Sequence, residues 1–251
     1  EWGLSPREWD RICRNLAVDP QGNVYGSTMG GLIWKFDPRQ LNPVSYVEGL
    51  DLSQVPFSQS AQETMKGDFH HNWRVIQWNP KTSSFWGLHF ETTTLFEFIP
   101  SVNYIRAVAE LRPEPYQGMP RNPEISQLGF TIAPKNTIFY LAHGPAVEME
   151  DRPPVQSAVH LIIYRIDQKK LINHGPILSA DKRRVFFSES IAIGPDDRIY
   201  TVAWVEITDP KRKAAVGKAR AYGPAETEKM VYEILLVRLP RWQQFVHNSA
   251  D

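Results

Sequence analysis

Residues 67–80 read GDFHHNWRVIQWNP and place two adjacent histidines and an arginine just before an apolar strand. His70, His71 and Arg74 are residue types that can move protons, bind a metal ion or pair with a carboxylate. Neighbouring residues of a strand point to opposite faces, so only one of His70 and His71 is expected to face a site. Their chemistry therefore depends on which elements hold them and on what those elements bring alongside.

The composition excludes several classes of function. Of 251 residues, 42% are hydrophobic and 22% charged, which is typical of a globular domain. Lys and Arg together number 28 and so do Asp and Glu, so no overall charge attracts nucleic acid or an anionic membrane. No apolar run reaches the length of a membrane-spanning helix. Cys13 is the single cysteine, which excludes an internal disulfide and Cys-rich metal motifs.

A unit of about sixty residues recurs four times and determines the expected fold. Each unit has an apolar strand, a proline-containing turn and an aromatic strand. The prolines are Pro20, Pro80, Pro134 and Pro195. An aromatic residue follows each proline by five positions: Tyr25, Phe85, Phe139 and Tyr200. Apolar residues stand two and four positions before each proline, which is the period of a strand. A third strand follows in each unit, and a fourth in most of them.

Three to four antiparallel strands per repeat predict an all-β protein, a β-propeller, with a β-sandwich as the alternative. We expect one domain over 1–251 with blades at about 11–50, 70–111, 125–178 and 186–246. The last blade lacks its outermost strand unless the segment RWQQFV (241–246) supplies it. Four blades are few for a propeller, and an open ring exposes sheet edges. The ring is thus expected to close tightly or to be completed by a partner chain or a further stretch of chain.

The repeated pattern of an apolar strand, Asp-Pro-x-Gly and an aromatic strand resembles the blades of lactonase-type propellers and of propeller polysaccharide lyases. The resemblance covers about residues 16–240. It implies a propeller architecture, and it implies activity only in outline, because function resides in sites carried by a fold.

In a propeller blade, the start of the first strand and the end of the second strand share one rim. Residues of the same repeat position should therefore gather there, together with the loop residues His70 and His71. Six positions before Pro20, Pro80 and Pro195 stand Arg14, Arg74 and Glu189. Nine positions after Pro80, Pro134 and Pro195 stand His89, His143 and Trp204. The sequence thus predicts one pocket of histidines and arginines on that rim.

Two kinds of chemistry suit this set. His70, His89 and His143 can hold a divalent metal such as zinc, manganese or calcium. Alternatively, the site can act as a lyase on an acidic polysaccharide, with Arg14 and Arg74 pairing with a uronate carboxylate. In that scheme His71 or His143 is the base, and the substrate is also held by Trp73, Trp204 and Glu189.

Our leading hypothesis is this carbohydrate-active lyase, which takes a polysaccharide or small-molecule ligand. A second hypothesis is a non-catalytic propeller that binds a partner protein or completes a multichain assembly. A third is a lactonase-like metal hydrolase, for which Glu189 and Asn15 are the available oxygen ligands. No signal peptide is visible, and the chain begins EWGLSP without a methionine. We take an extracytoplasmic or secreted location as a hypothesis.

Overall fold

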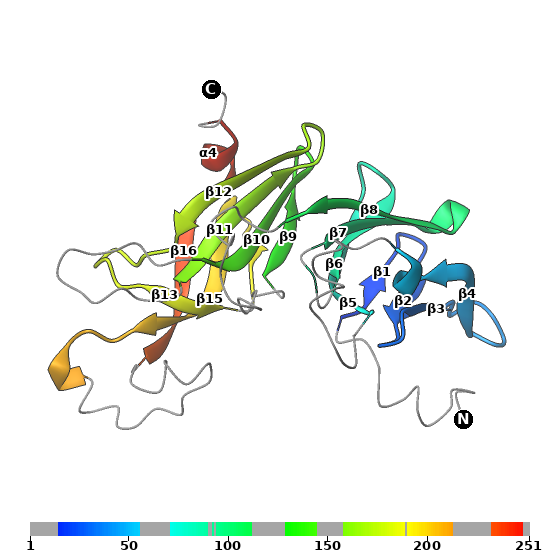
Figure 1. Cartoon of the computed structure of the whole chain (residues 1–251), viewed down its shortest axis with the longest axis horizontal. Helices are drawn as coiled ribbons and strands as arrows, with labels where there is room; N and C mark the ends of the chain where they lie inside the picture. Colours follow the sequence, from blue (N-terminus) through cyan, green and yellow to red (C-terminus); the bar gives the residue numbers. More distant parts are fainter. Residues whose placement is uncertain are drawn as a thin grey trace. The chain divides into compact units, whose positions relative to one another are not determined.

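The computed structural model describes residues 15–55, 71–89, 92, 94–111, 129–144, 158–188, 190–212 and 232–247. The chain forms two compact units, Glu1–Arg112 and Pro113–Asp251, and each unit contains two four-stranded antiparallel sheets. We number the four sheets in chain order and describe each unit by itself (Figure 1).

The first unit contains two sheets in which the strands follow one another in chain order. The first sheet consists of β1 (Ala17–Val18), β2 (Val24–Ser27), β3 (Leu32–Phe36) and β4 (Val44–Asp51). The second sheet consists of β5 (Trp73–Asn79), β6 (Ser84–His89), β7 (Thr94–Ile99) and β8 (Tyr104–Glu110). Short 3-10 helices, η1 (Leu52–Gln54) and η2 (Pro100–Val102), connect strands in this unit.

The second unit contains the third and fourth sheets. The third sheet consists of β9 (Phe130–Ala133), β10 (Thr137–Gly144), β11 (Ala158–Arg165) and β12 (Lys170–Pro176), again in chain order. The fourth sheet differs. Its innermost position is shared by β13 (Val185–Ser188) and β14 (Ala192–Ile193), which both pair with β15 (Arg198–Glu206). The other edge of β15 pairs with β16 (Tyr232–Arg241), which is followed by helix α4 (Trp242–His247).

Repeated antiparallel four-stranded meanders are the architecture of β-propeller blades. The prediction of an all-β protein with propeller blades is therefore confirmed. No helix in the part of the chain that the structure describes is long and apolar enough to cross a membrane.

The four prolines lie at matching hairpins, as the repeat predicted. In the first, third and fourth sheets, the aromatic residue five positions after the proline pairs with the residue three positions before that proline. These pairs are Ala17 with Tyr25, Thr131 with Phe139, and Ala192 with Tyr200. In the second sheet Phe85 pairs with Trp78, two positions before Pro80. The residues paired across the hairpin of the second sheet are thus seven positions apart instead of eight, so this hairpin is one residue shorter.

The core of the first unit lies between its two sheets. Tyr25 contacts Phe85 and Phe98 edge-on, with ring centroids 5.3 and 5.4 Å apart. Ile33 and Leu52 are also fully buried in this cluster. Tyr25 and Phe85, five residues after Pro20 and Pro80, both point into this layer, so this position of the repeat is a core position in the first unit.

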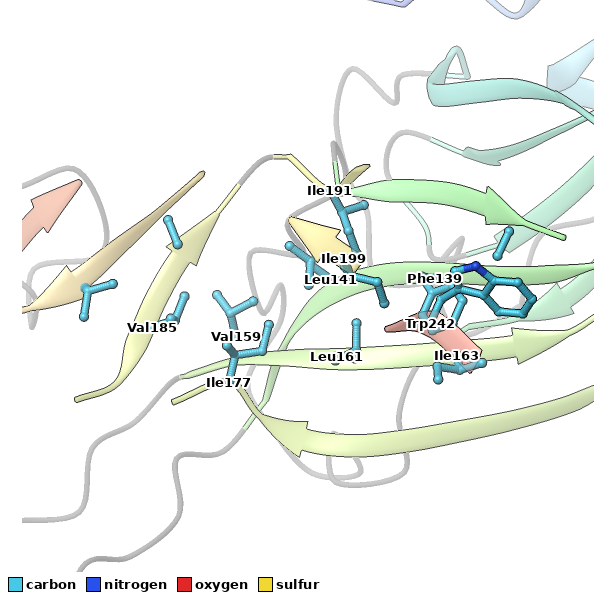
Figure 2. Close-up of a cluster of buried hydrophobic side chains, with 13 residues drawn as sticks. Phe139, Leu141, Val159, Leu161, Ile163, Ile177, Val185, Ile191, Ile199 and Trp242 are labelled. Carbon is cyan, nitrogen blue, oxygen red and sulfur yellow. The ribbon is translucent and has the colours of Figure 1, made fainter. Parts of the chain in front are cut away.

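The core of the second unit joins the third and fourth sheets, and Figure 2 shows its side chains. Phe139, Leu161 and Ile163 are buried there with Ile199, and Trp242 of α4 completes the cluster. The segment RWQQFV (241–246) does not supply an outermost strand for the last blade: Arg241 ends β16 and Trp242–His247 form α4. The helix forms because burying Trp242 and Phe245 against this core turns the chain away from the sheet edge.

Candidate functional site at the end of β5 and β6

His71 and His89 lie close together at one end of the second sheet. Trp73, the first residue of β5, pairs with His89, the last residue of β6, so the two strand ends share one edge. The main-chain N–H of His71 donates to the carbonyl of Met29 at 2.8 Å, which ties it to the β2–β3 turn. The His71 and His89 ring centroids are 6.2 Å apart. For this blade, the expected meeting of strand start and strand end is confirmed.

The surroundings of His89 fix its tautomer and its charge. Thr92 Oγ1 donates its one proton to Thr94 Oγ1 at 2.9 Å, so toward His89 Nδ1, at 3.2 Å, it acts as acceptor. Nδ1 therefore carries the proton and Nε2 keeps a lone pair. Burial, and secondly the nearby His71, lower the pKa of His89 to about 3. The imidazole is neutral at neutral pH, the form that a metal ion requires.

Three polar residues that the sequence did not single out surround this pair. Asn72 is buried next to His71, and in the described ranges its Oδ1 accepts no hydrogen bond. Gly31, with φ +102°, packs so closely that a Cβ there would lie 3.1 Å from Cβ of His71 and 2.7 Å from Oδ1 of Asp51. Asp51 therefore lies at the same end of the unit as His71, and Thr92 lies there through its contact with His89. No spacing in the sequence indicates them.

Arg74 and Trp73, the other two predicted site residues of this stretch, are both buried. Trp73 is fully buried, its indole Nε1 donates to the carbonyl of Asn15 at 2.9 Å, and its ring stacks on Phe96 at 6.2 Å. The structure thus places Trp73 in the hydrophobic core rather than at a rim, because its position in β5 faces the first sheet. Arg74 is 9% exposed.

The remaining predicted site residues belong to the second unit or lie outside the described residues. Trp204 lies in β15 of the second unit, half-buried, with its ring stacked on Tyr232 at 4.5 Å. His143 pairs with Val159 in the same unit, and its side chain is outside the described part. Arg14, His70 and Glu189 also lie outside the described residues.

The described ranges contain no group of three or more His, Cys, Asp or Glu side chains that could hold a metal ion. Of the predicted ligands, His89 is placed with a neighbouring imidazole, that of His71. The predicted three-histidine metal site therefore stays a prediction.

The fold defines a β-propeller protein, and comparison with known proteins gives no narrower class. No protein-family model matches the sequence, and no curated protein matches it significantly. A luciferin-regenerating enzyme is similar over 90% of this chain and 60% of its own, with 11% identity and a TM-score of 0.49. The Dos1 propeller is similar over 77% and 44%, with 9% identity and a TM-score of 0.43. YCF48 bound to D1 peptide is similar over 83% and 52%, with 10% identity and a TM-score of 0.44. The chain thus spans between 44% and 60% of the length of these structures.

Proposed function

We propose that this chain is a β-propeller scaffold whose first and last sheets bind further blades, so that the ring is completed by another chain. The observation that supports this proposal is that each of these two sheets has one apolar face exposed to solvent.

The exposed face of the first sheet is formed by the side chains opposite the core. Leu16 and Val18 are 53% and 54% exposed, although Ala17 between them is buried. The register continues this face through Val24, Phe36 and Val44 and through the pair Trp34 and Tyr46. We call this surface the N-face. Its side chains are those of Leu16, Val18, Val24, Trp34, Phe36, Val44 and Tyr46, and Gly26, which pairs with Trp34, lies among them.

The exposed face of the fourth sheet also carries several apolar side chains, with Glu206 opposite Tyr232 at one end. Val202 is 49% exposed and pairs with Leu236, which is 67% exposed. Trp204 pairs with Ile234, which is 62% exposed. The residues between them, such as Ala203 and Leu235, face the core of the second unit. We call this surface the C-face: Val202, Trp204, Tyr232, Ile234 and Leu236.

The second and third sheets differ from these two. All residues of β6 and β11 are buried, whichever face of the sheet they point to. Consecutive propeller blades pack face to face, so the first and last blades of an incomplete set each lack one neighbour. Contiguous exposed apolar surface marks interaction sites on soluble proteins. The N-face and the C-face therefore fit the packing of further blades.

The experiment is a measurement of particle mass in solution by analytical ultracentrifugation. In a solution of the purified chain, the available donor of blades is a second copy, so we expect self-association. Val18→Lys with Tyr46→Lys on the N-face, or Val202→Lys with Leu236→Lys on the C-face, should abolish it, because a buried lysine must be desolvated.

Leu41→Lys is the matched control for the mass measurement. Leu41 is 98% exposed and lies in the turn before β4, off both faces, so its substitution should leave the mass unchanged. A chain that remains monomeric at high concentration, with the same mass as its lysine variants, contradicts the scaffold proposal.

A second candidate function is the polysaccharide lyase with a divalent metal, which the nearness of His71 and His89 favours. In this proposal His71 is the base, Arg74 pairs with the uronate carboxylate, and His89 holds zinc, manganese or calcium. Arg14, His70, His143, Glu189 and Trp204 remain its proposed further site residues, and a polysaccharide its ligand.

The lyase is tested by incubating the chain with uronate-containing polysaccharides and measuring the unsaturated sugar product, with and without a chelator. His71→Ala should abolish product formation, and His174→Ala, in β12 of the second unit, should not. Absence of product with all substrates, together with no zinc binding by calorimetry, contradicts this second candidate.

A further inference from the structure

Among the residues that the structure describes, no strand lies at the outer edge of the fourth sheet, where each of the other three sheets has one. In those sheets the third strand pairs with a fourth: β3 with β4, β7 with β8, and β11 with β12. β16 occupies the corresponding third position, and among the described residues its only strand partner is β15. Its outer edge therefore presents main-chain N–H and carbonyl groups without a neighbouring strand in that part of the chain.

The described residues directly after β16, Trp242–His247, form α4 and pack on the hairpin between β14 and β15 instead of adding a strand to β16. Trp242 N donates to the carbonyl of Asp197 at 2.9 Å, and Gln243 Nε2 donates to Asp197 Oδ2 at 2.9 Å. Trp242 is buried, and the ring of Phe245 contacts those of Phe139 and His174. Unwinding α4 to form a fourth strand would expose these side chains.

The edge of β16 has a distinct pattern of charge. At its N-terminal end, Glu233 is neutralised by ion pairs with Arg183 and Arg212. At its C-terminal end, Arg238 and Arg241 are both exposed. Between these ends, Ile234 and Leu236 are exposed apolar residues. The edge is thus apolar in its middle and positive at the end where the other sheets begin their fourth strand.

We infer that the outer edge of β16 binds an extended segment of a partner protein as an added antiparallel strand. This inference rests on the proposed scaffold function and names the chemistry of one partner segment. Strand addition at a free sheet edge draws its affinity from main-chain hydrogen bonds and its specificity from alternate side chains. The positive end of β16 requires carboxylates near the N-terminus of the added strand.

The fourth strands of this chain show what such a segment looks like. They are seven or eight residues long, and in β8 residues that point inward alternate with exposed ones. A charged pair also joins a third and a fourth strand in the second sheet, where Arg106 donates to Glu97 at 2.7 and 2.9 Å. A partner segment with aspartates opposite Arg238 and Arg241 would repeat this arrangement with the charges exchanged.

The test uses a fluorescent synthetic peptide with two N-terminal aspartates followed by seven alternating valine and threonine residues. Fluorescence polarisation with the full chain should show saturable binding. The same peptide with alternate main-chain nitrogens methylated should not bind, because it cannot donate to β16. Equal binding of the methylated peptide, or no binding of the unmethylated peptide, overturns the inference.

A charge exchange identifies the edge. Arg238→Glu with Arg241→Glu should weaken binding of the aspartate peptide roughly two- to fivefold for each charge at low salt, and a peptide with lysines in place of the aspartates should gain affinity. Arg241→Gln is a milder second variant should the double change unfold the chain, which circular dichroism would reveal. No reciprocal change in affinity contradicts binding at β16.

Failure of this inference and failure of the scaffold proposal are distinguishable. Val18→Lys with Tyr46→Lys leaves β16 unchanged, so it should alter particle mass without altering peptide affinity. A monomeric chain that binds the peptide would refute blade binding through the two faces and support the added strand. A chain that associates through its faces and ignores the peptide would refute the added strand alone.

Discussion

The indole of Trp242 donates from Nε1 to the carboxylate of Asp197, 3.3 Å away, while the main-chain N–H of Trp242 donates to the Asp197 carbonyl. Asp197 is the left-handed residue of the hairpin between β14 and β15, with φ 63°. One turn residue of the last repeat thus fixes both the hairpin and the helix that ends the described chain. The described residues that follow β16 are therefore a helix packed on this hairpin and not a further strand.

Asp197→Gly should destabilise the chain by about 1–3 kcal/mol. Glycine keeps the left-handed conformation, but it removes the carboxylate that accepts hydrogen bonds from the indole of Trp242 and from the side chain of Gln243. Asp197→Asn keeps an oxygen acceptor and tolerates the same φ, so it should cost less. Urea unfolding followed by tryptophan fluorescence measures both variants. Equal stability of the glycine variant and the wild type would show that α4 does not depend on this contact.

Gly87→Ala should destabilise the first unit by about 1–3 kcal/mol. A Cβ at this position would lie 2.7 Å from the carbonyl oxygen of Val75 and 2.5 Å from Cζ of Phe96, so the pairing of β5 and β6 must shift. Gly30→Ala is the matched control, since its nearest atom is Thr28 Oγ1 at 3.8 Å. Thermal unfolding should separate the two variants, and similar melting temperatures would refute the tight fit at Gly87.

Trp73→Ala should destabilise the fold by about 3–5 kcal/mol, because it empties a fully buried position beside Phe96. Trp204→Ala should cost less, since that ring is half-buried on the C-face. Denaturant unfolding measures both. If Trp73→Ala were as stable as the wild type and only a ligand affinity changed, the core assignment of Trp73 would be wrong.

His89 should make stability depend on pH. Its folded pKa is lowered from 6.5 to about 3, so between these values the unfolded chain binds a proton that the folded chain does not. The stabilisation is full above pH 6.5 and is lost as pH falls, with a slope of up to about 1.4 kcal/mol per pH unit. His89→Gln should flatten this slope in urea titrations between pH 7 and pH 4. An unchanged slope in the variant would mean that His89 is already protonated in the folded chain.

Much of the fold follows from local pattern. The prolines, the aromatic residues five positions later and the alternation of apolar residues predict the hairpins, and the registers of Tyr25, Phe139 and Tyr200 agree. The pattern cannot distinguish a strand from a helix in the short segment RWQQFV. There the outcome depends on burying Trp242 in a tertiary core, which no spacing in the sequence encodes.

The candidate site was predictable only in part. Repeat position correctly brought the start of β5 beside the end of β6, and so His71 near His89. Asn72, Asp51 and Thr92 belong to the same end through turns whose packing depends on a glycine at position 31. Trp73 was expected at a rim, but a bulge between Trp73 and Val75 in the pairing with β6 accompanies its burial.

The one-residue register difference of the second sheet limits how its parts can be exchanged. Ile76 and Trp78 face the core because Trp78, and not Gln77, stands opposite Phe85. If the hairpin around Pro80 were replaced by the one around Pro20 in a chimera, β5 would slide by one residue and every side chain would change face. Gln77 would then enter the aromatic layer and Ile76 would leave it. Engineering by blade recombination in this chain must therefore keep each inner strand with its own turn.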